Sequence, residues 1–130
     1  MNHKEVREVY NASVDKAFED MANIVMQTVA DYWGVTIDDI KHSVRDKGVI
    51  IMRHETQYLM KKLIPKIPLA CVGRFTGNGK PKDHATVLHA FRKVSRELEA
   101  TTMKGRPAYP DLHERIDDLT MRIKCNFIFQ

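Results

Sequence analysis

The segment 82–94 carries the side chains of this chain that are best suited to contact nucleic-acid bases. Its apolar residues recur at three- and four-residue intervals, which predicts a helix with one buried stripe made of Val87, Phe91, Val94 and Leu98. Polar and small residues begin this helix or lie off the stripe: Lys82, Asp83, His84, Ala85, Thr86, His89 and Lys93. A first turn that exposes such residues fits the major groove of duplex DNA, where short side chains reach the base edges.

The positive charge of the chain is concentrated in one segment. Residues 41–82 contain ten Lys and Arg residues against two acidic ones, which gives a formal charge of +8. The rest of the chain has 11 basic and 15 acidic residues and carries −4. A basic block beside an acidic remainder is typical of a surface that binds a polyanion. The alternative interpretation is a solvated basic face that has no partner.

The sequence gives little support for catalysis or for a metal site. Its six histidines are scattered, and it contains no HExxH motif and no CxxC pair. The absence of a GxxxxGK[ST] phosphate loop predicts that the chain has no ATPase activity. No apolar run approaches the ~20 residues of a membrane span, and two distant cysteines are typical of reduced cytosolic thiols. We therefore expect a non-enzyme in the cytoplasm that needs no cofactor.

Helical periodicity runs through the chain and predicts an all-α fold, a small bundle of five to six helices. The helices are expected at 4–33, directly after Thr36, and at 49–63, 68–74, 84–101 and 110–124. Gly34 is predicted to end the first helix and Thr36 to cap the second. Glycine, asparagine and proline make 76–82 a loop, and 45–48 also has the composition of a loop. A short edge strand is expected only at 127–129.

A short helix, a turn and a longer helix that begins with polar residues describe a helix-turn-helix. The turn at 76–82 is longer than the three or four residues of the tightest examples. In the helix expected at 49–63, the inward face is predicted to hold Met52, Thr56, Leu59 and Leu63. Arg53, Gln57 and Lys61 are spaced four residues apart and are expected to share the opposite, outward face.

Residues 24–95 resemble the C-terminal DNA-binding domain (domain IV) of the bacterial replication initiator DnaA. The motif that carries the resemblance comprises Val72-Gly73, Phe75, Lys82-Asp83-His84, Ala85-Thr86, Val87-Leu88-His89-Ala90 and Arg92-Lys93. The basic positions upstream also match, namely Arg45, Lys47, Arg53 and Lys61. Two departures concern the target sequence: Ala85 replaces a hydroxyl residue, and the loop at 76–82 is longer than the glycine pair of the family.

The resemblance implies recognition of a short duplex box, with A·T-rich sequence. Arg45 would enter the minor groove, whose narrow A·T-rich form attracts guanidinium groups. The major-groove residues would be Asp83, His84, Ala85 and Thr86. Contacts to bases or phosphates would come from Lys47, Arg53, Lys61, Lys82 and Lys93.

We expect a single domain over 1–130, with an initiator-like core at 24–101, an N-terminal helical extension at 1–23 and a C-terminal one at 102–130. The function that the sequence favours is sequence-specific binding of double-stranded DNA by a stand-alone bacterial or phage protein. Such a protein would act near the nucleoid in the regulation of replication or transcription. The alternative is a protein-interaction module with non-specific DNA affinity, which would dock a replication or transcription protein. Self-association is compatible with either function.

Overall fold

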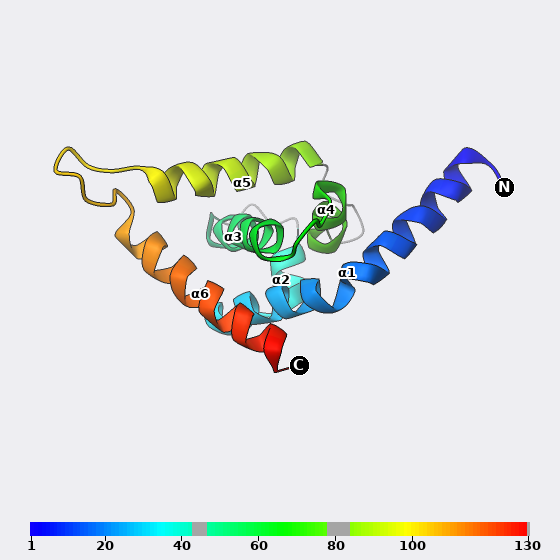
Figure 1. Ribbon diagram of the computed structural model, residues 1–130, viewed down its shortest axis with the longest axis horizontal. Coiled ribbons are helices and arrows are strands. Elements are labelled where there is room, and N and C mark those ends of the chain that lie inside the picture. The colour runs from blue at the N-terminus through cyan, green and yellow to red at the C-terminus, as the bar shows by residue number, and fades with distance from the viewer. Residues whose placement is uncertain (43–46, 78–83, 130) are drawn as a thin grey trace.

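The computed structural model of this protein describes residues 1–42, 47–77 and 84–129. These residues form six helices and no named strand, which confirms the predicted all-α class (Figure 1). The helices are α1 (His3–Trp33), α2 (Ile37–Lys41), α3 (Lys47–Leu63), α4 (Leu69–Thr76), α5 (His84–Glu99) and α6 (Pro110–Ile128). None of them is both long and apolar enough to cross a membrane.

The junction between α1 and α2 follows from two residue types. Gly34 adopts a φ of +70° at the end of α1, and its backbone N–H is shared between the carbonyls of Ala30 and Asp31. Thr36 then caps α2, because its hydroxyl accepts from the Asp39 N–H at 3.1 Å. The Asp39 carboxylate accepts in return from the Thr36 N–H at 2.9 Å. Both predicted helix boundaries are thereby confirmed.

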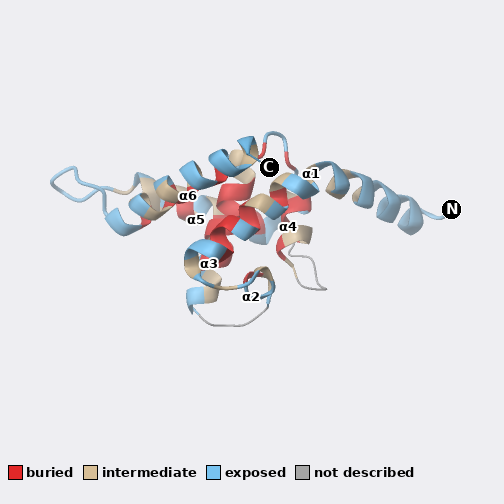
Figure 2. Cartoon of the chain, turned by 90° about the horizontal axis from the view of Figure 1, so that it is seen from below, coloured by how far each residue is buried: buried red, intermediate tan, exposed pale blue. Residues whose placement is uncertain are grey.

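α3 is the central helix, and its middle part, residues 52–60, is buried on nearly all sides (Figure 2). It packs against each of the other five helices. Met52, Thr56 and Leu59 are buried as predicted, but the expected outward face is not outward. Gln57 is fully buried, and Arg53 is only 8% exposed. The prediction failed because a four-residue spacing of polar side chains indicates a solvated face only for a helix that is covered on one side.

Two buried polar side chains of α3 bind partners on other helices. Gln57 Nε2 donates to the Thr76 hydroxyl of α4 at 3.0 Å. The Glu55 carboxylate lies 2.6 Å from Arg115 Nε of α6, and the Arg115 guanidinium stands 5.2 Å from the centre of the Trp33 ring of α1. Burial raises the pKa of Glu55 and outweighs the hydrogen bond and charge of Arg115, which lower it. These contacts therefore fix where α4 and α6 sit on α3.

The C-terminal part of the chain belongs to the same core as the rest. α6 packs on α1 and α3, and it buries Leu112, Ile116, Leu119 and Ile123 in the main hydrophobic cluster. The helix continues to Ile128, so the strand expected at 127–129 does not form. The reason is that Phe127 extends the buried spacing of α6 by one more turn and packs on the core.

Three other boundaries differ from the sequence-based expectation. α4 ends at Thr76 and not at 74, and residues 78–82 of the predicted loop lie outside the described residues. Lys47 and Gly48 belong to the first turn of α3 and not to a loop. α5 ends at Glu99 instead of continuing to 101. The next residues turn back through an isolated antiparallel bridge between Thr101 and Pro107. This turn joins α5 to α6 at the end of the molecule opposite the N-terminus (Figure 1).

One ion pair joins α1 to α4 across a long stretch of sequence. The Arg74 guanidinium donates from Nε and Nη2 to the Asp15 carboxylate at distances of 2.8–3.0 Å. Burial raises the pKa of Asp15, but the hydrogen bonds from Arg74 and Cys71 and the charge of Arg74 together lower it below its usual value. The pair therefore stabilises the fold when Asp15 is ionised.

We expect Asp15→Asn to lower the free energy of unfolding by about 1 kcal/mol at neutral pH. The folded-state pKa of Asp15 is lowered, so its contribution is complete above the unfolded-state pKa of about 3.9 and is lost as the pH falls through the folded value. Urea unfolding followed by circular dichroism at neutral and acidic pH measures both free energies. A deficit in the variant that stays constant into acid would contradict the role given to the ion pair.

Candidate nucleic-acid interface

The first turn of α5 presents its residues to solvent. His84, Ala85 and Thr86 are all exposed at the start of the helix. Beneath them, the predicted stripe is confirmed: Val87 and Val94 are buried, and Phe91 and Leu98 pack on the core. The Phe91 ring lies 5.1 Å from the ring of Tyr58, which fixes α5 against α3. The helix is therefore held by one face, and its N-terminal turn is exposed to solvent.

The outer face of α5 continues this surface along a shallow groove. It is lined by Ala85, Leu88, His89, Phe91, Arg92, Ser95 and Arg96. Arg92 and Arg96 are exposed and follow Ala85 at intervals of seven and eleven residues, so they share its face of the helix. Neither arginine was among the site residues predicted from the sequence. Their spacing of seven and eleven residues from Ala85 is the sequence signal that would have placed both arginines on the outer face of this helix.

Lys93 differs from the neighbouring Arg92 in its surroundings. Its ammonium lies 2.6 Å from Glu97 Oε1, one turn further along α5, and its side chain is 43% exposed. The Glu97 carboxylate partly neutralises this cation. Of the basic pair at 92–93, Arg92 therefore presents the stronger positive charge to solvent.

His54 of α3 and His89 of α5 meet edge to face behind this surface, with ring centres 6.2 Å apart. His89 is nevertheless exposed, so it both packs against the preceding helix and belongs to the outer face. Burial lowers the pKa of His54, and the positive charges of Lys93, His89 and Arg53 lower it further. The neutral form of His54 is thereby favoured behind the basic surface.

Arg53 lies apart from the residues of α5 and binds the end of α2. Its Nε donates to the Ile40 carbonyl at 2.9 Å, and Nη2 donates to the His42 carbonyl. Burial lowers the pKa of its guanidinium. The segment that contains Arg45 begins directly after His42. Arg53 therefore holds the point from which that segment starts, and it does not face outward as the sequence-based prediction had it.

The remaining predicted site residues have different environments. Lys47 is exposed at the start of α3. Lys61 is half-buried, and its ammonium donates to the Ile67 carbonyl at 2.5 Å, whereas the adjacent Lys62 is exposed. Three predicted residues lie outside the described residues: Arg45, Lys82 and Asp83.

Other chemistry has little structural support in the described part of the chain. There, no three His, Cys, Asp or Glu side chains come together in a way that could hold a metal ion. Cys71 is fully buried, and burial together with the nearby Asp15 carboxylate raises its pKa to about 12. A thiol with such a pKa stays protonated at neutral pH and is a poor nucleophile.

We expect Arg53→Lys to lower the free energy of unfolding by about 1–3 kcal/mol, because a lysine cannot bridge the Ile40 and His42 carbonyls as the guanidinium does. The substitution keeps the positive charge, so any general electrostatic attraction is retained. Lys47→Ala, at an exposed cation on the same helix, is the control and should leave the thermal midpoint nearly unchanged. If Arg53→Lys were as stable as the wild type but bound DNA poorly, Arg53 would be a direct contact.

Comparisons with known proteins agree with the resemblance seen in the sequence. The chain matches the family model of the bacterial DnaA helix-turn-helix over residues 22–94. The chromosomal replication initiator protein DnaA of Bdellovibrio bacteriovorus is 34% identical over 96 residues, which are 74% of this chain and 19% of that protein. DnaA of Lactiplantibacillus plantarum is 31% identical over 101 residues, or 78% of this chain and 20% of the relative. DnaA of Thermoanaerobacter sp. is 27% identical over 110 residues, which are 85% of this chain and 22% of that protein.

The chain thus spans about a fifth of the length of the curated relatives that it matches. The family model covers more than half of the chain, from the second half of α1 to the buried Val94 of α5. This region contains α4 and most of α5, including the exposed first turn of α5. On this evidence the chain belongs to the family of the bacterial DnaA helix-turn-helix domain.

Proposed function

We propose that this protein binds double-stranded DNA sequence-specifically by placing the first turn of α5 in the major groove. The observation that carries the proposal is the exposure of His84, Ala85 and Thr86 on a helix whose opposite face is locked into the core. Membership of the DnaA helix-turn-helix family supports DNA as the ligand. The N-terminal part of a recognition helix is also the part that reads base edges in helix-turn-helix proteins.

The side chains of this turn have complementary recognition chemistry. The ring nitrogens of His84 offer a donor and an acceptor to base edges. Ala85 and Thr86 bring methyl groups that fit against thymine methyls, and this fits an A·T-rich box. Asp83 is proposed to act beside them, and Arg45 to reach into the adjacent minor groove.

Phosphate contacts would come from the cations around this turn. Arg92 and Arg96 extend along the outer face of α5, and Lys47 is exposed at the start of α3. Lys61, Lys82 and Lys93 are proposed as further contacts, and Lys61 would first have to exchange its carbonyl partner for a phosphate. Arg53 is proposed as a positioning residue for the segment that carries Arg45. Such contacts fix the register on the duplex without reading its sequence.

The biological role that we propose is regulation of replication or transcription, exerted by binding and without ATP hydrolysis. A helix-turn-helix that occupies initiator-type boxes competes with other proteins for those boxes.

Fluorescence anisotropy with two duplexes tests the proposal, one with an A·T-rich initiator-type box and one with the same bases scrambled. We expect the box to be preferred by ~10³ or more, and the preference to persist at near-physiological salt. Equal and salt-sensitive binding to both duplexes would refute sequence reading and leave a non-specific binder. Absence of binding would favour the alternative of a protein-docking module.

We expect His84→Ala to weaken binding to the box by about 1–3 kcal/mol, because it removes a side chain that reads base edges. Binding to the scrambled duplex and the thermal midpoint should stay nearly the same, since His84 is exposed. His3→Ala is a matched control, at an exposed histidine near the beginning of α1. An unfolded His84→Ala variant in circular dichroism would show instead that His84 is structural.

We expect Arg92→Ala to weaken binding to both duplexes alike and to reduce the slope of log K against log salt by about one. Lys93→Ala should have a smaller effect, because Glu97 already neutralises part of its charge. Lys124→Ala removes an exposed cation from α6 and serves as the control. Equal effects of all three substitutions would mean that only net charge matters and that α5 has no special role.

A further inference from the structure

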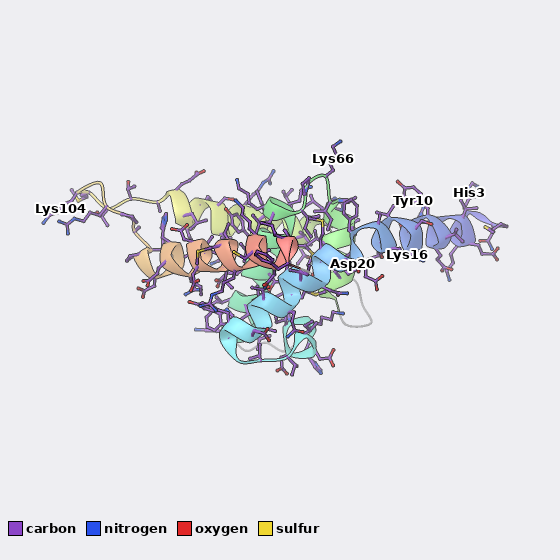
Figure 3. The ribbon with its side chains drawn as sticks, turned by 60° about the horizontal axis from the view of Figure 1, so that its bottom comes forward. His3, Tyr10, Lys16, Asp20, Lys66 and Lys104 are labelled. Atoms are coloured by element: carbon purple, nitrogen blue, oxygen red, sulfur yellow. The ribbon has the colours of Figure 1, made fainter. Side chains whose placement is uncertain are left out.

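The first half of α1 projects from the body of the molecule (Figure 3). It carries an exposed apolar stripe. Val6, Val9 and Tyr10 are 52%, 56% and 67% exposed. Ser13 and Ala17 continue the stripe at helical spacing and are also exposed. An isolated helix of this length is marginal in water, and bulky apolar residues on it favour a partner.

The order of side chains along the stripe is complementary to the stripe of a second copy that lies antiparallel to it. Its large residues stand in the N-terminal half, and its small residues, Ser13 and Ala17, stand in the C-terminal half. When two copies lie antiparallel, Val6 faces Ala17 of the other copy, and Tyr10 faces Ser13. Each large side chain then packs on a small one, which lets the two backbones approach. A parallel pair would instead oppose large with large and leave a gap between the small residues.

Charge favours the same arrangement. Glu5 and Lys16 are exposed, lie within about 20° of each other around the helix and are separated by about 16 Å along it. In the antiparallel pair, the Lys16 side chain of one copy lies along Val9 of the other copy and reaches Glu5, which is one helical turn N-terminal to that Val9. The twofold symmetry of the pair produces this ion pair twice. The ion pairs within the described residues involve neither Glu5 nor Lys16. Both charges are therefore available to a second copy.

We propose that the first half of α1 is a self-association surface through which two copies of this chain pair antiparallel. The contact spans three helical turns, which is small beside the ~1,200–2,000 Å² of stable interfaces, and each copy carries a net charge of +4. DNA neutralises that repulsion and raises the local concentration of neighbouring copies. The pair thus forms mainly between chains bound to adjacent boxes, and this part of the inference rests on the proposed function.

The position of α1 fits such a pair on one duplex. The helix leaves the body at the end of the molecule where α5 begins (Figure 1). A chain bound to a neighbouring box on that side would therefore lie near the projecting part of α1. A twofold protein pair requires two boxes in inverted orientation at a fixed spacing. Directly repeated boxes do not match this symmetry, and cooperativity on them should be absent.

Binding to duplexes with one box and with two boxes tests the pairing, in both orientations and over a range of spacings covering one helical turn. On inverted boxes at the matching spacing, we expect the second copy to bind about tenfold more tightly than the first. Lys16→Glu should abolish this factor, and Glu5→Lys/Lys16→Glu should restore it, while single-box affinity stays near wild type in both. Glu8→Lys, on the charged face away from the stripe, is the control. Circular dichroism must show intact helices, because Glu5 also accepts a hydrogen bond from Asn2 near the start of α1.

Sedimentation equilibrium of the free chain at high concentration separates this inference from the proposed function. We expect weak dimerisation that Lys16→Glu removes and the double variant restores, whether or not the chain reads a box. Loss of single-box binding would refute the proposed function while leaving this dimerisation intact. A chain that stays monomeric and fills two boxes independently, or that associates equally in all variants, would overturn the inference.

Discussion

The burial of α3 on nearly all sides is the constraint on which the rest of the structure depends. The surrounded middle of this helix, residues 52–60, cannot direct most of its polar side chains to water, and an unpartnered buried polar group costs about 1–3 kcal/mol. Three polar residues of α3 meet this constraint by binding a different neighbour each, and the Thr56 hydroxyl donates to the Met52 carbonyl within α3. Arg53 binds the end of α2, Glu55 binds Arg115 of α6, and Gln57 binds Thr76 of α4. The apolar contact between Tyr58 and Phe91 adds α5 to the same set.

This arrangement links the core to the candidate interface. α5 contributes its apolar stripe to the core and keeps its first turn outside it, so the exposed residues sit on a rigid support. A rigid support lowers the entropy cost of binding a ligand in one orientation. The C-terminus of α2 is fixed by Arg53, and α5 packs on α3, so the same central helix supports α5 and the end of α2.

The sequence was sufficient for those features that depend on local residue patterns. The periodicity of α5, the Gly34 end of α1 and the Thr36 cap of α2 all have local causes, and the structure confirms them. The environments of Arg53 and Gln57 were not predictable, because both depend on helices distant in the sequence that cover α3. A local pattern could not reveal the pairing of Asp15 with Arg74 either, since 59 residues separate them. In the candidate interface, Lys93 was among the predicted residues and Arg92 was not, although Lys93 is paired with Glu97 and Arg92 is exposed.

The central claim is that the first turn of α5 reads the sequence of duplex DNA. Two-dimensional NMR of the labelled chain, titrated with a box duplex and with its scrambled counterpart, tests it most directly. We predict that the box duplex shifts the amide signals of residues 84–96 most strongly, and that the shifts from the scrambled duplex are weaker and disappear with added salt. Identical shifts from both duplexes, or shifts centred on α6 with α5 unaffected, would contradict the account.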